Sequence, residues 1–194
     1  MIRRRGMHFL FAIAIAGLIL VGGGRAVAGD PGYKSSIERY DIPDVVLVNQ
    51  DGAKIRLKSL IESDKPVVLD FIYATCTTIC PVLSAGFTSI QARLGPDTRK
   101  MQLISISIDP EHDTPKIMKE YLKPFRAKPG WDFLTGTRED IDRVMRAFDS
   151  YIPDKMSHRQ ETFIRGRSPG RWVRIKGLIG SADLMKEIGK ANQK

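Results

Sequence analysis

Two continuous apolar runs constrain the fold of this chain more than any other feature. Residues 65–74, KPVVLDFIYA, and residues 101–109, MQLISISID, each have the length of one strand. Runs of this kind are typical of strands that are buried on both faces in the middle of a sheet. The segment 81–95 between them has Pro81 in its first turn and Gly95 just past its end, which is typical of a helix. Together the three segments predict a strand–helix–strand unit.

The rest of the chain predicts further elements around this unit. An alternating segment around Asp51-Gly52 predicts a hairpin near the N-terminus, and residues 161–175 predict a second hairpin around Ser168-Pro169-Gly170. Residues 131–136 predict a short strand or a turn. Helices are expected over residues 115–125, 138–148 and 182–190, with Thr114, Thr137 and Ser181 as their N-caps. This order indicates an α/β domain with helices on both faces of a central sheet.

The first 28 residues differ in composition from this domain. A basic start, residues 1–5, precedes a short apolar run, residues 8–21, and Ala26-Val27-Ala28 places small residues before Gly29. This layout is typical of a secretory signal peptide, because a membrane-spanning helix needs about 20 apolar residues. The alternative is an uncleaved membrane anchor. Both interpretations place the domain outside the cytoplasm, most simply in an oxidising bacterial periplasm.

Residues 29–40 are polar and are expected to be a linker to a domain over residues 41–194. The formal net charge of the chain is +9, and residues 1–28 contain four arginines and no acidic residue, so the remainder carries +5. These charges are interleaved with acidic residues, and no basic block contains aromatic residues. Nucleic-acid binding is therefore not expected, whereas docking to an acidic or membrane-bound partner agrees with the charge.

The two cysteines of the chain, Cys76 and Cys80, lie in the sequence FIYATCTTICP, where the first buried strand ends and the helix begins. Functional sites of open α/β sheets favour this edge, and the N-terminus of a helix lowers the pKa of a thiol. If the first helical turn reached back to Cys76, a spacing of four would place both sulfurs on one face.

Several interpretations of this pair compete. A purely structural disulfide would close a very short loop and would therefore stabilise the fold little. Thioredoxin-like oxidoreductases have two residues between their cysteines, whereas this pair has three. Two thiolates suit Cu(I), with one imidazole completing a trigonal site, while a structural zinc ion would need four ligands. A peroxidase ranks last: Thr77 and Cys80 form a Thr-x-x-Cys element, but Tyr73 stands where a proline is expected.

Two histidines outside the N-terminal segment could supply the imidazole. His112 follows the second buried strand in the loop DPEHDTP, and His158 precedes a predicted strand in the loop PDKMSHRQETF. Spacing alone favours an exposed loop histidine in both cases. In the predicted sheet, however, the second loop folds towards the first strand–helix turn, which favours His158 as a ligand. Met156 could add a weak thioether ligand, although such a residue more often packs or lies at the surface.

These motifs, in this order, resemble the Sco/SenC family of copper chaperones. The resemblance covers most of residues 42–194 and is carried by CxxxCP at residues 76–81, IDPxxDTP at residues 108–115 and LTGT at residues 134–137. It implies a thioredoxin-like fold with a central mixed sheet.

The resemblance also implies a function and a set of site residues. Family members bind copper through the two cysteines and one later histidine. They deliver copper to the dinuclear copper site of cytochrome c oxidase, or reduce the cysteines of that site as thiol–disulfide oxidoreductases. In this chain the copper ligands, for Cu(I) or Cu(II), would be Cys76, Cys80 and His158. The cysteines would also form a redox-active pair that needs a thioredoxin-type reductant. Asp109 and Asp113 lie in the acidic loop of the family and are expected to form a turn and cap a helix.

Two departures from the family pattern stand at the expected site. Thr77 and Thr78 replace the usual Pro and Asp between the cysteines, and His158 lies in Met-Ser-His-Arg-Gln instead of following an Asp. They indicate a divergent Sco-like subgroup.

Overall fold

The structure is a computed structural model that describes residues 32–193 of the chain. The segment interpreted as a signal peptide or anchor, residues 1–28, lies outside the described residues. Within residues 32–193, no helix is both long enough and apolar enough to cross a membrane.

The described residues form one eight-stranded sheet with the strand order β1-β8-β7-β4-β5-β6-β2-β3. The strands are β1 (Tyr33–Glu38), β2 (Val46–Asn49), β3 (Lys54–Arg56), β4 (Val67–Ile72), β5 (Gln102–Ser107), β6 (Trp131–Thr135), β7 (Glu161–Arg165) and β8 (Trp172–Gly177). Strands β4, β5 and β6 run parallel, and the other pairs are antiparallel. The sheet is therefore mixed, as expected, and its parallel centre is the predicted strand–helix–strand unit.

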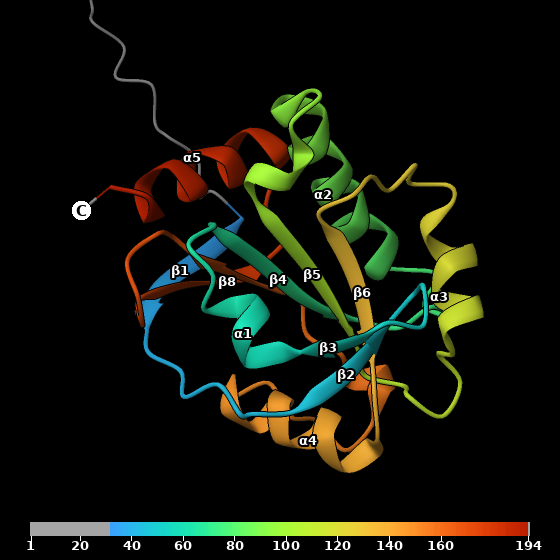
Figure 1. The fold of residues 1–194 in the computed structure, drawn as a ribbon. Helices are drawn as coiled ribbons and strands as arrows, with labels where there is room; N and C mark the ends of the chain where they lie inside the picture. Colours follow the sequence, from blue (N-terminus) through green and yellow to red (C-terminus); the bar gives the residue numbers. More distant parts are fainter. Residues whose placement is uncertain (1–31, 194) are drawn as a thin grey trace, which may run out of the picture.

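Helices cover both faces of this sheet, with α2 and α5 on one side and α4 on the other (Figure 1). The helices are α1 (Leu57–Ile61), α2 (Cys80–Leu94), α3 (Pro115–Leu122), α4 (Arg138–Ala147) and α5 (Ser181–Ala191), with 3₁₀ turns η1 (Thr98–Lys100) and η2 (Lys155–Ser157). Helix α3 lies beside α2: the hydroxyl of Tyr121 on α3 and the hydroxyl of Ser84 on α2 are hydrogen-bonded at 2.8 Å. The predicted α/β arrangement is confirmed.

Local capping explains where two of the helices begin. The hydroxyl of Thr114 accepts the N–H of Ile117, and the hydroxyl of Thr137 accepts the N–H of Asp140, as the sequence predicts. The expected Ser181 cap is wrong, since Gly180 holds that position and Ser181 is the first helical residue. Helix α1 was not predicted because it has only five residues and no side-chain cap, and it instead buries Leu57 and Ile61.

The expected linker over residues 29–40 is wrong for its central part, because Tyr33–Glu38 form the edge strand β1. This strand pairs with β8 from Tyr33↔Gly177 to Glu38↔Trp172. Its four central side chains are exposed, so its composition carries no apolar pattern. Backbone hydrogen bonds to a strand far along the chain stabilise it, and a polar surface is usual for an edge strand.

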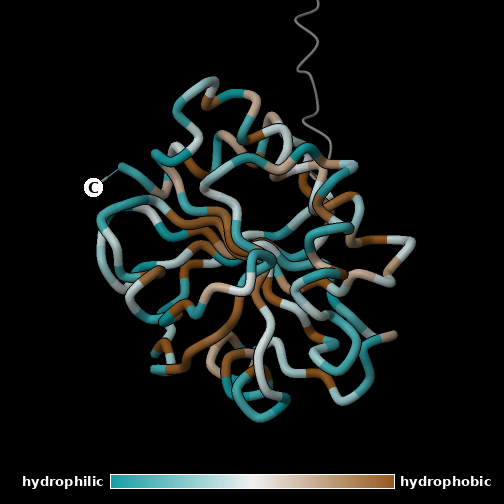
Figure 2. The backbone as a smooth tube through the Cα atoms, turned by 45° about the vertical axis from the view of Figure 1, so that its right-hand side comes forward, coloured by the Kyte–Doolittle hydropathy of each residue, from teal (hydrophilic) through white to brown (hydrophobic). Residues whose placement is uncertain are grey.

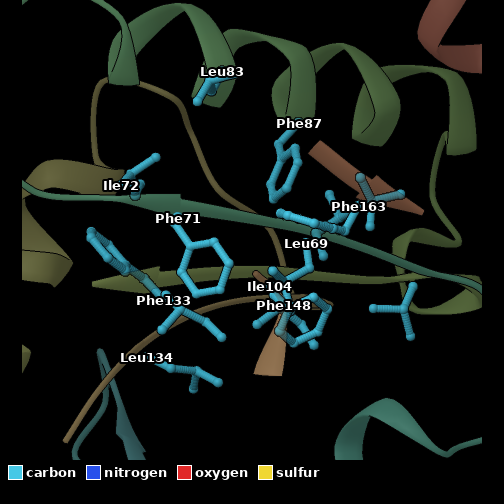
Figure 3. Packing of buried hydrophobic residues seen from close by; sticks show 14 of the residues in the cluster. Leu69, Phe71, Ile72, Leu83, Phe87, Ile104, Phe133, Leu134, Phe148 and Phe163 are labelled. Carbon is cyan, nitrogen blue, oxygen red and sulfur yellow. The ribbon is translucent and has the colours of Figure 1, made fainter. Parts of the chain in front are cut away.

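The hydrophobic core packs against both faces of β4. The apolar segments gather at the centre of the molecule, and polar loops surround them (Figure 2). On one face Phe71 of β4 packs against Phe148 and Phe163, with ring centroids 5.7 and 5.8 Å apart. On the other face lies Phe87 of α2, which is labelled in Figure 3. Its ring packs against Trp131, with ring centroids 5.3 Å apart. The aromatic packing around Phe71 therefore lies near the end of β4, where the cysteines follow, whereas Trp131 lies beside the start of this strand, because it pairs with Leu103 and Leu103 pairs with Val68.

Candidate functional site

The cysteines lie in the short connection between β4 and α2, at the carboxyl edge of the parallel strands. Strand β4 ends at Ile72, Cys76 lies in the connection, and Cys80 is the first residue of α2. The first turn of the helix does not reach back to Cys76, so the condition under which a spacing of four would place both sulfurs on one helical face is not met. Pro81 explains this, because its ring would clash with the backbone carbonyl four residues earlier and so favours a helix that starts beside it. Instead, the backbone N–H of Cys80 points at the sulfur of Cys76, 3.4 Å away.

The two thiols have opposite electrostatic environments. Burial alone would raise the pKa of Cys76, but hydrogen bonds from Cys80 and Thr78 outweigh it and lower this pKa to about 7. Burial raises the pKa of Cys80 far above its ordinary value, and the neighbouring Cys76 raises it further. At neutral pH, Cys76 is therefore the thiol that ionises, while Cys80 keeps its proton.

His158 is the predicted ligand that the fold brings to this pair. Its Nδ1 lies 3.9 Å from the sulfur of Cys80. Burial lowers the pKa of His158, so the imidazole is neutral and keeps a nitrogen lone pair. Its Nε2 is buried and has no hydrogen-bond partner. A buried, neutral imidazole next to two thiols is chemically suited to bind a soft metal ion.

The three side chains are neighbours without being a preformed metal cage. Within residues 32–193, no three His, Cys, Asp or Glu side chains are arranged to hold a metal ion as they stand. Two ligands that share one ion at about 2.0–2.3 Å are roughly 3.5–4 Å apart when the angle between them is near 120°. The separation of 3.9 Å between Cys80 and His158 agrees with this spacing. A side-chain movement would still be needed to bring all three ligands around one ion.

Both ends of the loop that carries His158 are closed by buried polar contacts. Ser150, at its start, donates to the Glu161 carboxylate at 2.7 Å, and Glu161 begins β7. Arg174 of β8 donates to the same carboxylate at 2.8 Å and is itself buried. Near the middle of the loop, the Lys155 ammonium lies 2.5 Å from the Asp109 carboxylate. These contacts were not predicted from the sequence, because they join segments without any periodic pattern.

Asp109 and Asp113 have structural contacts, as expected, but they do not cap the helix. The Asp113 carboxylate accepts the N–H of Ala74, at 3.2 and 3.3 Å from its two oxygens, and the hydroxyl of Ser107 at 2.6 Å. Asp113 therefore fixes the backbone two residues before Cys76. Thr114 is the residue that caps α3.

His112 does not join the thiols. Its Nδ1 lies 3.0 Å from the Asp109 carboxylate, and its side chain is largely exposed. The interpretation of His112 as an exposed loop histidine agrees with this position.

A dithiol placed between a central strand and the following helix, in a mixed sheet of this topology, defines a thioredoxin-like protein. The family model described as SCO1/SenC matches residues 41–188. The chain therefore belongs to the SCO1/SenC family.

Individual relatives agree with this assignment. The SCO1 protein homolog of Bacillus subtilis is 30% identical over 135 residues, which cover 66% of this chain and 69% of that protein. The structure of Bradyrhizobium japonicum ScoI with copper bound has a TM-score of 0.64 and 28% identity, and the match covers 78% of this chain and 99% of ScoI. A second solved structure is that of BsSco, a member of the Sco family of cytochrome c oxidase assembly proteins, in which a disulfide switch is described. It has a TM-score of 0.65 and 26% identity to this chain. That match covers 79% of this chain and 94% of BsSco.

Proposed function

We propose that the protein is a copper-binding chaperone that delivers copper to the dinuclear copper site of cytochrome c oxidase or of a similar cuproprotein. Cys76, Cys80 and His158 are the copper ligands in this proposal. The observation that carries it is the position of His158, whose Nδ1 lies 3.9 Å from the sulfur of Cys80. A protein that only exchanged disulfides would need the two thiols but no imidazole. The copper-bound relative adds independent support.

Copper is the cargo of this site, and the ligands determine which oxidation state binds and how binding depends on pH. Two thiolates and one neutral imidazole form a trigonal set that suits Cu(I), and Cu(II) would draw on the same atoms. The Cys80 thiol must lose its proton to bind, although its pKa is raised. Copper binding should therefore release protons and become weaker as the pH falls.

The proposed location is the periplasm. A signal peptide or anchor over residues 1–28 would carry the domain across the inner membrane, and an anchor would hold it there. The net charge of +5 outside this segment favours contact with acidic partners or membrane surfaces. An oxidising compartment would convert the free pair to a disulfide, so the proposal includes a thioredoxin-type reductant.

Thiol–disulfide exchange is a second candidate function, and the different pKa values of the two cysteines favour it. The Cys76 thiolate would attack one sulfur of a partner disulfide, forming a mixed disulfide and releasing the other partner sulfur as a thiol. Cys80 would then lose its proton and displace the second partner sulfur. The partner gains two electrons and two protons, and a Cys76–Cys80 disulfide remains for the reductant. The peroxidase interpretation is disfavoured, because it needs Cys80 as the thiolate and this thiol is fully buried.

A Cu(I) titration of the reduced protein against a competing chelator tests the proposal. The wild type is expected to bind one Cu(I) tightly, and His158→Ala is expected to bind it about 10- to 100-fold more weakly. His112→Ala is the matched control and should bind like the wild type. If Cu(I) does not bind tightly, or if the affinity does not depend on His158, the copper-chaperone assignment is wrong and thiol exchange becomes the better proposal.

A further inference from the structure

Met156 is an exposed sulfur residue beside a pair of covered thiols. Its side chain is 75% exposed, in the turn η2 two residues before His158. Cys76 is only 5% exposed, and Cys80 is fully buried. A methionine that faces solvent buries almost no apolar surface, so hydrophobic stabilisation does not account for its position.

The phenol of Tyr73 connects Met156 to the site. The Tyr73 hydroxyl donates to the Met156 sulfur, 3.7 Å away. The ring of Tyr73 packs edge-on against His158, with ring centroids 6.3 Å apart. Burial, the nearby charge of Cys76 and a hydrogen bond with Cys76 together raise the pKa of Tyr73 to about 12. The thioether, the imidazole and the first thiol therefore each contact the Tyr73 side chain, so the exposed Met156 sulfur lies one side chain away from the site.

The backbone around Met156 is held in place. The carboxylate of Asp154 accepts the N–H of Met156 at 2.9 Å, and Lys155 forms its ion pair with Asp109. Two contacts thus fix the residues on the N-terminal side of Met156, and His158 packs against Tyr73 on the other side. The position of the sulfur follows from this ordered turn.

We propose that Met156 is a transfer ligand, whose thioether binds Cu(I) transiently between the donors of a partner and the set Cys76, Cys80 and His158. The inference rests on the proposed copper-binding function. Thioethers are soft ligands that suit Cu(I), and a neutral thioether is displaced more readily than a thiolate. An exposed weak ligand beside a covered strong site suits both capture and release.

The exchange involves no redox step. On release, the bond between copper and the Cys76 sulfur breaks while a bond to the Met156 sulfur forms. A soft donor of the partner then replaces the thioether, and further partner donors displace the Cys80 sulfur and the His158 nitrogen. Copper remains Cu(I) throughout. The thioether carries no proton, so the protons that return from solvent go to the two departing thiolates.

The variant Met156→Leu tests this inference, because leucine keeps the approximate volume and removes the sulfur. The reduced full-length protein, loaded with one Cu(I), is mixed rapidly with excess bicinchoninate, and the rate of copper transfer is measured. The rate is expected to fall about tenfold in Met156→Leu, which corresponds to an increase of about 1.4 kcal/mol in the activation barrier. The equilibrium affinity should change by less than about twofold, because capture and release slow together. Met185→Leu, on α5, is the matched control and should leave the rate unchanged.

Each other outcome overturns a different statement. An unchanged transfer rate with intact Cu(I) binding overturns the role of Met156 alone. A large loss of equilibrium affinity would make Met156 a resident ligand and would also overturn a transfer role. If the reduced wild type does not bind Cu(I) tightly, the proposed function fails, and the inference about Met156 fails with it.

Discussion

The ammonium of Lys155 lies 2.5 Å from the carboxylate of Asp109, and this contact joins the loop that carries His158 to the loop that follows β5. Asp109 is almost completely buried, and Lys155 is about one-third exposed. The pair lowers the pKa of Asp109, although burial acts in the opposite direction. It therefore holds the middle of the His158 loop against the sheet, in addition to the polar contacts at the ends of the loop.

Lys155→Met removes this tether and is expected to weaken Cu(I) binding about fivefold, the equivalent of roughly 1 kcal/mol. The effect should act through His158, so it should disappear when Lys155→Met is combined with His158→Ala. A Cu(I) competition titration of the four proteins measures this coupling. Lys123→Met, which removes an exposed ion pair with Glu120, is the control. Equal losses with and without His158 would show that Lys155 does not act by positioning the histidine.

Cys76 is expected to react with iodoacetamide in the metal-free protein with a pH midpoint near 7, whereas Cys80 stays unmodified across neutral pH. Cys80→Ala removes the hydrogen bond from the Cys80 thiol, so the Cys76 midpoint should rise towards the ordinary value of about 8.5. Alkylation rates followed by mass spectrometry give both midpoints. A Cys80 that reacts first, or a Cys76 midpoint that is the same in both proteins, would contradict this account of the pair.

The core of the fold was predictable because its signals are local. The continuous apolar runs of β4 and β5 predict that both strands are buried. Thr114 and Thr137 cap α3 and α4 through contacts only three residues along the chain. Strand β1 was not predictable, because its stability depends on pairing with β8, at the other end of the chain. A polar hexapeptide carries no sign of that partner.

The site was predictable in its residue types and less so in its geometry. The spacing of Cys76 and Cys80, the topology and the family resemblance together predicted His158 as the third candidate ligand. The start of α2 at Cys80 depends on how Pro81 limits the helix, so the spacing of four residues does not by itself say whether both cysteines are helical. Contacts such as Tyr73 with Met156 join residues 83 positions apart through a loop, and no sequence pattern predicts them.

Arg174→Met is expected to destabilise the protein by about 3–5 kcal/mol, because it leaves the buried carboxylate of Glu161 without its charged partner. The guanidinium lies 2.8 Å from that carboxylate, and both side chains are buried. Replacing both residues, with Glu161→Leu added, should recover part of the loss, since no buried charge then remains unpaired. Urea denaturation of the reduced proteins measures the difference. A single variant that unfolds like the wild type would show that the Glu161 carboxylate does not depend on Arg174 in the fold.

Asp70 is expected to make the stability of the fold depend on pH. It lies in the middle of β4, fully buried, and its carboxylate oxygens have no hydrogen-bond partner. Burial raises its pKa from the ordinary 3.8 to about 7, although the nearby Ser105 acts in the opposite direction. The folded protein therefore binds this proton more tightly than the unfolded chain does. Its contribution to stability is fully present below about pH 4 and is lost as the pH rises towards 7.

Asp70→Asn removes the titrating group while keeping a side chain of similar size. Below about pH 4, the difference in free energy of unfolding between the variant and the wild type should hardly change with pH. By pH 8, the free energy of unfolding of the variant should have increased by a few kcal/mol relative to that of the wild type. Urea denaturation of both reduced proteins at several pH values gives the difference curve, in which the titrations of His158 and the cysteines, common to both proteins, largely cancel. A difference that stays constant from pH 4 to pH 8 would mean that Asp70 has the same pKa in the folded and unfolded states. If the free energy of unfolding of the variant increases relative to that of the wild type between pH 4 and pH 8, Asp70 is the group that holds the proton in the folded protein.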